Sequence, residues 1–284
     1  MSAELVSVGV LTLNGWDLLL ILVVSIQSTA LAYMGHPRWK AFLLTLPVPF
    51  TLATLSVGQP IGPTNVIGLV LLMGYTYGVY VLHARWRIPI VLSIALCAAG
   101  YCGAATALAA RLPTSEIAFW ASVLGVFALG VLLYRLMPWR AEPEHRSPLP
   151  PYIKAPMIAA VILFLVIIKQ QLQGFMTVFP MVSLVASYEG RRCLWTLARQ
   201  IPVLMMTTLP MMATIHLLGP AVGMGWSLVG GWIVFLGVLI PFTRRQWAVD
   251  GAGRTAASGD AELTAGSSEV NKPMAANPPI TRTG

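Results

Sequence analysis

The sequence predicts an all-α fold, a polytopic bundle of transmembrane helices, from three observations. Of the 284 residues, 57% are hydrophobic and only 10% are charged, whereas a soluble domain usually carries about 25% charged residues. The apolar residues stand in long blocks, which match the roughly 20 residues that an α-helix needs to cross the hydrocarbon core. Within each block the apolar character is continuous, unlike the alternation of a barrel strand. Helices are therefore the expected spanning structure, because every backbone polar group inside a bilayer needs a partner.

Composition argues against several other classes of protein. The net charge is +8, but the basic residues lie in short segments between the apolar blocks. Membrane topology explains this placement, and we expect no nucleic-acid partner. The cysteines Cys97, Cys102 and Cys193 have no metal-ligand spacing with a histidine, so we expect no metal site and no cofactor. Because no cluster of catalytic side chains is visible, we do not expect an enzyme.

The first half of the chain, residues 1–136, holds five predicted spans. Gly35-His36-Pro37 ends the first span, and the second contains Pro47 and Pro49, which break a helix. The turn-forming residues 58–63 separate the second span from the third. The five spans cover about residues 16–34, 41–57, 64–82, 88–110 and 117–136.

The second half, residues 154–247, holds four predicted spans. Residues 137–153 contain five prolines and form the predicted cytoplasmic loop between the halves. Pro180 is expected to break the seventh span, and Pro202 and Pro210 are expected to break the eighth. The four spans cover about residues 154–168, 174–188, 195–218 and 222–242.

The placement of basic residues supports this count of nine spans. Counted with the adjacent helix ends, 16 of the 18 Lys and Arg residues fall on one side, and only Arg111 and Lys169 fall on the other. Because cytoplasmic loops hold an excess of Lys and Arg, we expect the N-terminus outside and the C-terminus inside a bacterial-type cytoplasmic (inner) membrane. Residues 248–284 are rich in Gly, Ala, Ser, Thr and Pro and lack aromatics, which predicts a disordered cytoplasmic tail.

The two short spans with prolines can be aligned without gaps. Their shared layout, with a long helix before and two longer spans after, suggests that helices 1–4 and 6–9 form a repeat. An offset of five helices reverses orientation, so the repeat would be inverted, as in many secondary transporters. The alternative is a chance match between apolar windows. The alignment places Phe42, Pro47, Ala53 and Thr54 on Phe175, Pro180, Ala186 and Ser187.

Residues around the break in the seventh span carry a family resemblance. They are Phe179-Pro180, Leu184-Val185-Ala186-Ser187-Tyr188, Arg192, Leu197, Ile201 and Pro210. In this pattern the chain resembles the GlpM-like small inner-membrane proteins, four-helix proteins that are linked by annotation to alginate production. The resemblance covers about residues 155–242 and implies a fused pair of such units, but no catalytic residue. The first half departs from the pattern, since Leu55 stands where Tyr188 would align.

The main functional hypothesis concerns the helices that contain prolines. Carbonyl groups released by the prolines, together with nearby polar side chains, are expected to line a solute path near the midplane, as broken helices do in transporters. The alternative is that the Ser and Thr side chains only satisfy the kinks, and that Arg199 only reaches the headgroups. The predicted path residues are Gln27, Thr45, Pro47, Thr51, Thr54, Tyr75, Thr177, Pro180, Ser183, Arg199, Thr207, Thr208 and Pro210.

A second candidate site lies at the outer end of the sixth span. Lys169, Gln170 and Gln173 are expected to form an outer vestibule that meets an anionic or hydrogen-bonding solute. The alternative is that the lysine reaches the headgroups and the glutamines form a solvated turn.

Asp17 and Glu189 fall at helix ends, so no carboxylate is expected near the midplane.

These features together predict a secondary transporter or permease for a small, anionic or polyhydroxylated solute. The inverted repeat and the broken helices support it, as does the absence of an ATP-binding motif such as GxxxxGK[ST]. The alternative is a non-transport accessory subunit of an envelope polysaccharide or lipid pathway, which the GlpM-like resemblance supports. The expected partners are the lipid bilayer and the solute, with a second copy of the chain or an envelope-pathway protein as further candidates.

Overall fold

The described part of the chain is almost entirely helical. A computed structural model gives its coordinates, and the chain forms two compact units, Met1–Gly237 and Val238–Gly284. A short antiparallel hairpin, β1 (Val6–Val8) and β2 (Leu11–Leu13), precedes the helices. The predicted sixth span, residues 154–168, lies outside the described residues. The structure describes residues 6–8, 11–13, 15–34, 37–138, 140, 142 and 173–270.

The helices of the first half follow the predicted spans closely. The second span is divided into two helices at Leu46-Pro47, because proline removes a backbone donor and clashes with the preceding turn. The third span runs on from α4 into a π-helical turn, η1. The bounds are α1 (Gly15–Tyr33), α2 (Pro37–Thr45), α3 (Val48–Val57), α4 (Pro63–Tyr80), η1 (Val81–Arg85), α5 (Ile90–Ala109) and α6 (Glu116–Leu136).

The second half contains a broken helix of the same kind. The 3₁₀-helix η2 (Gln173–Val178) is separated from α9 (Met181–Glu189) at Phe179-Pro180. The last element, α10, runs from Leu194 to Val270. The prediction that Pro202 and Pro210 break the eighth span is wrong, because α10 keeps helical backbone angles through both prolines. Each proline removes only one backbone donor, and the surrounding turns hold the helix together.

The chain reverses within α10 at Gly223. This glycine has φ 80° and ψ 166°, a conformation that side chains disfavour. A methyl group at Gly231 would lie 2.8 Å from Ile215 Cγ1, and one at Gly230 would lie 2.9 Å from Leu218 Cδ1. The segment after the glycine therefore packs back against the segment before it. The predicted boundary between the eighth and ninth spans falls a few residues earlier, at 219–221.

Four helical stretches of the described chain are long and apolar enough to cross a membrane. Large apolar side chains on their surface are exposed, for example Leu124 at 70% and Ile233 at 69%, as expected for contact with lipid. The chain is thus a helical protein with the character of a membrane protein, while the count of nine spans and the sidedness stay predictions. The four stretches are Pro63–Arg85, Ile90–Ala109, Glu116–Leu136 and Leu194–Arg244.

The second unit, Val238–Gly284, contains the end of α10. The helix continues to Val270, so that the predicted disordered tail, residues 248–284, falls partly on helical residues. Residues 271–284 lie outside the described part of the chain.

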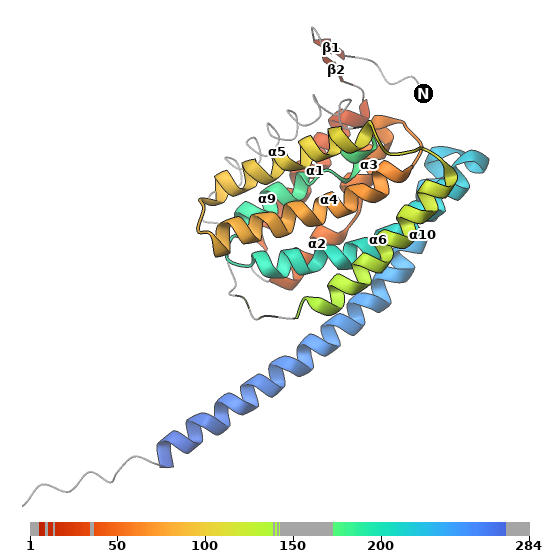
Figure 1. The fold of residues 1–284 in the computed structure, drawn as a ribbon. Helices are drawn as coiled ribbons and strands as arrows, with labels where there is room; N and C mark the ends of the chain where they lie inside the picture. Colours follow the sequence, from red (N-terminus) through yellow and green to blue (C-terminus); the bar gives the residue numbers. More distant parts are fainter. Residues whose placement is uncertain are drawn as a thin grey trace, which may run out of the picture. The chain divides into compact units, whose positions relative to one another are not determined.

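The two broken helices pack against each other within the first unit, and Figure 1 labels their segments α2, α3 and α9. The second segment of the first broken helix, α3, packs against η2, and its first segment, α2, packs against α9. This pairing of first with second segments shows that the two broken helices run in opposite directions past each other. Around them, α1 packs against α3 and α9, and α4 packs against η2, α5 and α6.

Two glycine positions allow η2 to lie close to α4. A methyl group at Gly68 would lie 3.2 Å from Val178 Cβ, and one at Gly174 would overlap Thr64 Oγ1. The second broken helix therefore reaches the centre of the unit only because these positions lack side chains.

Replacing Gly174 with alanine tests this close approach. The new methyl group would overlap Thr64 and displace η2, so the variant should lose thermal stability, by roughly the 1–3 kcal/mol typical of overpacking. Gly125→Ala is the matched control, because it lies on α6 with nothing within 4 Å of the added methyl and should retain or gain stability. Tryptophan-fluorescence melting of the purified proteins in detergent measures both. Equal melting temperatures for Gly174→Ala and the parent would contradict the packing.

Candidate functional site

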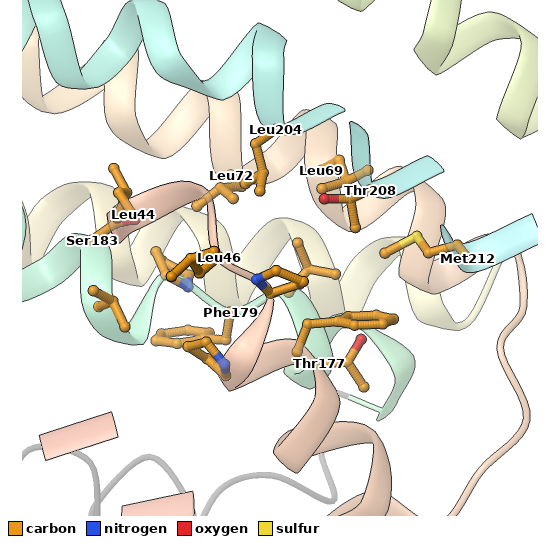
Figure 2. A pocket seen from close by; sticks show the side chains of 16 residues that line it. Leu44, Leu46, Leu69, Leu72, Thr177, Phe179, Ser183, Leu204, Thr208 and Met212 are labelled. Atoms are coloured by element: carbon orange, nitrogen blue, oxygen red, sulfur yellow. The ribbon is translucent and has the colours of Figure 1, made fainter. Parts of the chain in front are cut away.

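A cavity of about 60 Å³ lies between the two helix breaks (Figure 2). Four elements or breaks contribute to its wall: the α2–α3 break, the η2–α9 break, α4 and α10. The lining is mostly apolar, with hydroxyl groups from Thr177, Ser183 and Thr208. No charged side chain of the described chain lines this cavity, which we call the central pocket.

The two breaks line the central pocket at positions that the predicted alignment of the halves pairs with each other. In the alignment of the two halves, each position corresponds to the one 133 residues later. Every pocket residue of the first break has its counterpart in the wall, so the two breaks present the same positions to the same space. The first set is Leu44, Leu46, Pro47, Pro49 and Phe50, and the second is Thr177, Phe179, Pro180, Val182 and Ser183. The next helix of each half completes the wall, with Leu69 and Leu72 from α4 and with Leu204, Thr208 and Met212 from α10.

Carbonyl groups released by the prolines already have partners. Pro47 cannot bond to the carbonyl of Leu43, and the side chain of Gln27 donates to that oxygen instead, at 2.9 Å. Pro180 releases the carbonyl of Met176, which accepts the backbone N–H of Phe179 at 3.2 Å. The prediction that released carbonyls line the path therefore fails for these two groups, because each is taken by the protein itself.

Side chains of the neighbouring helices also bond to the first residues of η2. The amide of Asn65 donates to the carbonyl of Gly174 at 3.1 Å and to the hydroxyl of Thr177 at 2.8 Å. The hydroxyl of Tyr101 donates to the carbonyl of Phe175 at 2.9 Å. Both side chains are buried. The sequence analysis missed these two residues, although a lone asparagine inside an apolar span is a signal of such a role.

Five predicted path residues line the central pocket. They are Pro47, Thr177, Pro180, Ser183 and Thr208.

Most other predicted path residues bond to helix backbone. Thr45 donates to Phe42 at 2.6 Å, and Thr54 donates to Phe50 at 2.8 Å. The hydroxyl of Thr207 donates to the carbonyl of Val203 at 2.9 Å. Thr51 donates to Pro47 at 2.9 Å and accepts the indole N–H of Trp232 at 2.9 Å, and the carbonyl of Pro210 accepts from Thr214 at 2.8 Å.

The remaining predicted residues lie away from the central pocket. Tyr75 is buried on α4 and faces Ser187 of α9. Arg199 donates to the carbonyl of Met137 at 3.1 Å. For the predicted outer vestibule, Lys169 and Gln170 lie outside the described residues, and Gln173 is the first residue of η2.

Two carboxylates predicted at helix ends are buried there. Asp17, in the first turn of α1, is fully buried and accepts a hydrogen bond from the hydroxyl of Ser56. Glu189, the last residue of α9, is only 3% exposed and lies near Tyr33. In the alignment of the halves, Glu189 corresponds to Ser56.

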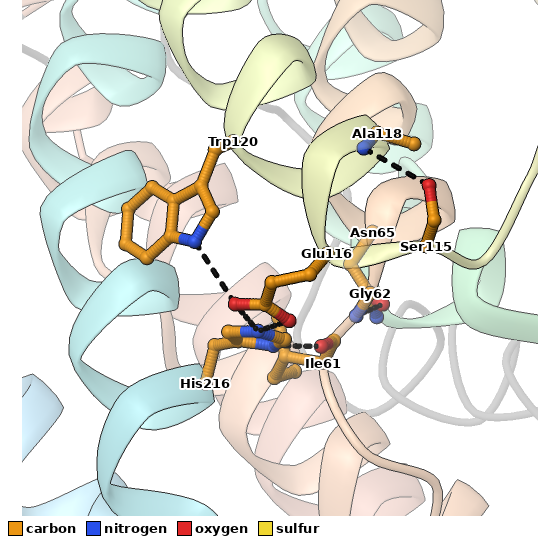
Figure 3. Close-up of polar contacts among 8 residues, drawn as sticks. All are labelled: Ile61, Gly62, Asn65, Ser115, Glu116, Ala118, Trp120 and His216. Carbon is orange, nitrogen blue, oxygen red and sulfur yellow. Dashed lines mark hydrogen bonds and ion pairs between the residues drawn. The ribbon is translucent and has the colours of Figure 1, made fainter.

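A polar cluster joins α10 to α6 and to the start of α4 (Figure 3). His216 Nδ1 lies 2.8 Å from the carbonyl oxygen of Ile61, and Nε2 lies 3.0 Å from the Glu116 carboxylate. The ring of Phe119 stacks on the imidazole at 3.8 Å, and Trp120 donates to Glu116 at 2.9 Å. Each ring nitrogen of His216 thus faces an oxygen atom of a neighbouring element. We call this cluster the outer clamp, after its predicted side of the membrane.

A second cluster joins the other end of α6 to the start of α10. The carboxylate of Glu142 accepts the backbone N–H groups of Trp195 and Thr196 at 3.1 and 2.8 Å, which places a negative charge at the N-terminus of α10. The indole of Trp195 donates to Pro138 at 2.9 Å, and the Arg140 guanidinium lies 4.1 Å from its ring centroid. We call this cluster the inner clamp.

Between the clamps, α6 also contacts the middle of α10. A methyl group at Gly130 would lie 3.2 Å from Met205 Cβ. The helix that has no counterpart in the proposed repeat is thus fastened to α10 at both ends and at its centre.

No protein-family model matches the chain, and neither a curated protein nor a solved structure matches it. The GlpM-like resemblance therefore stays a prediction.

A double-mutant cycle tests the outer clamp. His216→Gln and Glu116→Gln should each lower the melting temperature, and the double variant should lose little more than one single variant. Residues in contact couple by about 0.5–3 kcal/mol. The control pairs His216→Gln with Glu142→Gln from the inner clamp, for which the two effects should add. Additive effects for His216 and Glu116 would show that the two side chains are not coupled, so that their contact does not contribute to stability.

Proposed function

We propose that the chain is a secondary transporter or permease for a small solute, built as an inverted repeat in a bacterial-type cytoplasmic membrane. The observation that carries the proposal is the central pocket, which is lined by residues of two broken helices. In inverted-repeat transporters the solute binds at the interface of the repeats, beside discontinuous helices near the midplane.

The contacts between the broken helices support the inverted relation of the halves. A two-fold axis that lies in the membrane plane and passes through the central pocket would exchange the two broken helices. Such an axis requires α3 to pack on η2 and α2 to pack on α9, as these segments do. In this proposal helices 1–4 and 6–9 form the two repeats and α6 connects them. Nine spans, with the N-terminus outside and the C-terminus inside, follow from the odd offset and from the distribution of basic residues.

The two clamps suggest how access to the pocket alternates. The outer clamp and the inner clamp lie at opposite ends of the contact between α6 and α10. Opening one clamp while the other stays closed would expose the pocket to one side at a time, by rocking of one helix group against the other. The GlpM-like resemblance agrees with this arrangement, because its Phe179-Pro180 pair forms one wall of the pocket.

Accessibility of a cysteine in the central pocket tests the proposal. Ser183→Cys is placed in a chain whose Cys97, Cys102 and Cys193 are replaced by alanine. A small membrane-impermeant methanethiosulfonate is then added to right-side-out or to inverted vesicles. Alternating access predicts that this cysteine reacts from both sides.

Two control positions calibrate the reaction. Leu124→Cys, exposed on the apolar surface of α6, should react from neither side because its thiol lies in lipid. Gln59→Cys, in the predicted outer loop, should react only from outside. If Gln59→Cys reacts but Ser183→Cys reacts from neither side, the transporter proposal fails and the accessory-subunit alternative is favoured. Reaction of Gln59→Cys from the cytoplasmic side would overturn the proposed sidedness.

A further inference from the structure

Two helices begin at the central pocket. The N-cap of α3 is Pro47 and that of α9 is Pro180, and both line the pocket. The helices have 10 and 9 residues, long enough for aligned peptide dipoles. Each N-terminus carries the equivalent of about +0.5 elementary charge, so together they present roughly one positive charge to the same space.

Three first-turn N–H groups of these helices are open within the described residues. The backbone N–H groups of Phe50, Val182 and Ser183 have no hydrogen-bond partner within the described residues, and all three residues line the pocket. A helix leaves its first N–H groups without intrahelical partners, and no capping side chain bonds to either of these helices. These amides therefore remain available as donors.

Carbonyl groups close to the breaks have side-chain donors. Side chains from α1, α4 and α5 donate to the carbonyls of Leu43, Gly174 and Phe175. Among the described residues, the charge balance at the breaks thus favours the positive helix ends, because these carbonyls have partners and the three N–H groups have none.

An unpartnered hydroxyl gives an independent sign of a missing ligand. Thr208 lines the pocket from α10 (Figure 2) and is only 2% exposed. Its Oγ1 is buried and has no hydrogen-bond partner among the described residues. A buried polar group without a partner costs about 1–3 kcal/mol, and a hydrogen-bond acceptor in the pocket would remove this cost.

We infer that the central pocket binds a small monovalent anion between the N-termini of α3 and α9, with a hydrogen bond from Thr208. This inference rests on the proposed function, because it names the solute class of the same pocket. One negative charge matches the roughly single positive charge of the two helix ends. A cavity of about 60 Å³ holds an ion of a few heavy atoms. An ion that enters the pocket loses water molecules, and the apolar wall offers few polar groups in their place. Weakly hydrated ions such as nitrate should therefore bind better than strongly hydrated ones.

Tryptophan-fluorescence melting of the detergent-purified full chain provides the test. Sodium nitrate, chloride or formate is titrated against sodium gluconate at constant ionic strength, and nitrate is tested again with N-methylglucamine as the cation. We expect a saturable rise in melting temperature that follows the anion and not the cation, with nitrate the most effective and sulfate without specific effect. A rise that follows sodium, or no saturable rise with any of the three anions, would overturn the inference.

Matched variants locate the site. Thr208→Val keeps the shape of the side chain and should raise the apparent Kd for nitrate about tenfold, as expected for a lost hydrogen bond to a charged group. Thr207→Val is the control, because this neighbouring hydroxyl bonds to its own helix, and its Kd should not change. An unchanged Kd in Thr208→Val would overturn the assignment.

Failure here is distinguishable from failure of the proposed function. A Ser183→Cys thiol that reacts from both sides, with no anion effect on melting, would leave a transporter for another solute. Anion binding without reaction from either side would leave an anion site in a protein that does not transport.

Discussion

Backbone carbonyl and N–H groups at the two helix breaks need hydrogen-bond partners, and the rest of the structure depends on this constraint. Pro47 and Pro180 each release a carbonyl in an apolar interior, where an unpaired backbone group costs several kcal/mol. The carbonyl released by Pro180 accepts the backbone N–H of Phe179. The other carbonyls at the breaks bond to polar side chains placed deep in otherwise apolar helices. Gln27 bonds to the first break, and Asn65 and Tyr101 bond to the second. These residues hold the broken helices in register against α4 and α5.

The same constraint determines the character of the central pocket. The carbonyl groups released at the breaks are paired with a side chain or a backbone N–H, whereas the N–H groups of Phe50, Val182 and Ser183 have no partner among the described residues. Open donors therefore outnumber open acceptors where the helices meet. Crossing of the broken helices in opposite directions brings both donor sets to one cavity. The connecting helix α6 is joined to α10 by two polar clusters, one near each of its ends.

The sequence alone was sufficient for the helices of the first half and for both proline breaks, because apolar block length and proline chemistry are local properties. It predicted the path residues that line the pocket but did not separate them from Thr45, Thr54 and Thr207. The hydroxyl groups of these three threonines bond to carbonyls of their own helices, which depends on side-chain rotamers that a sequence does not show. It missed Asn65 and Tyr101, whose partners lie 109 and 74 residues away. It also placed breaks at Pro202 and Pro210, since a proline pattern does not show how neighbouring turns support a helix.

A disulfide between α4 and η2 is the most direct test that the second broken helix reaches the central pocket. A Cβ at Gly68 would lie 3.2 Å from that of Val178, close to the roughly 3.5–4.5 Å of a disulfide. Gly68→Cys with Val178→Cys is placed in the chain without native cysteines, with a protease site inserted between residues 143 and 153. After oxidation and cleavage, the account predicts that the fragments stay joined until reduction, while a control with Gly74→Cys in place of Gly68→Cys separates. Separation of the fragments in both variants would contradict the crossing of the broken helices.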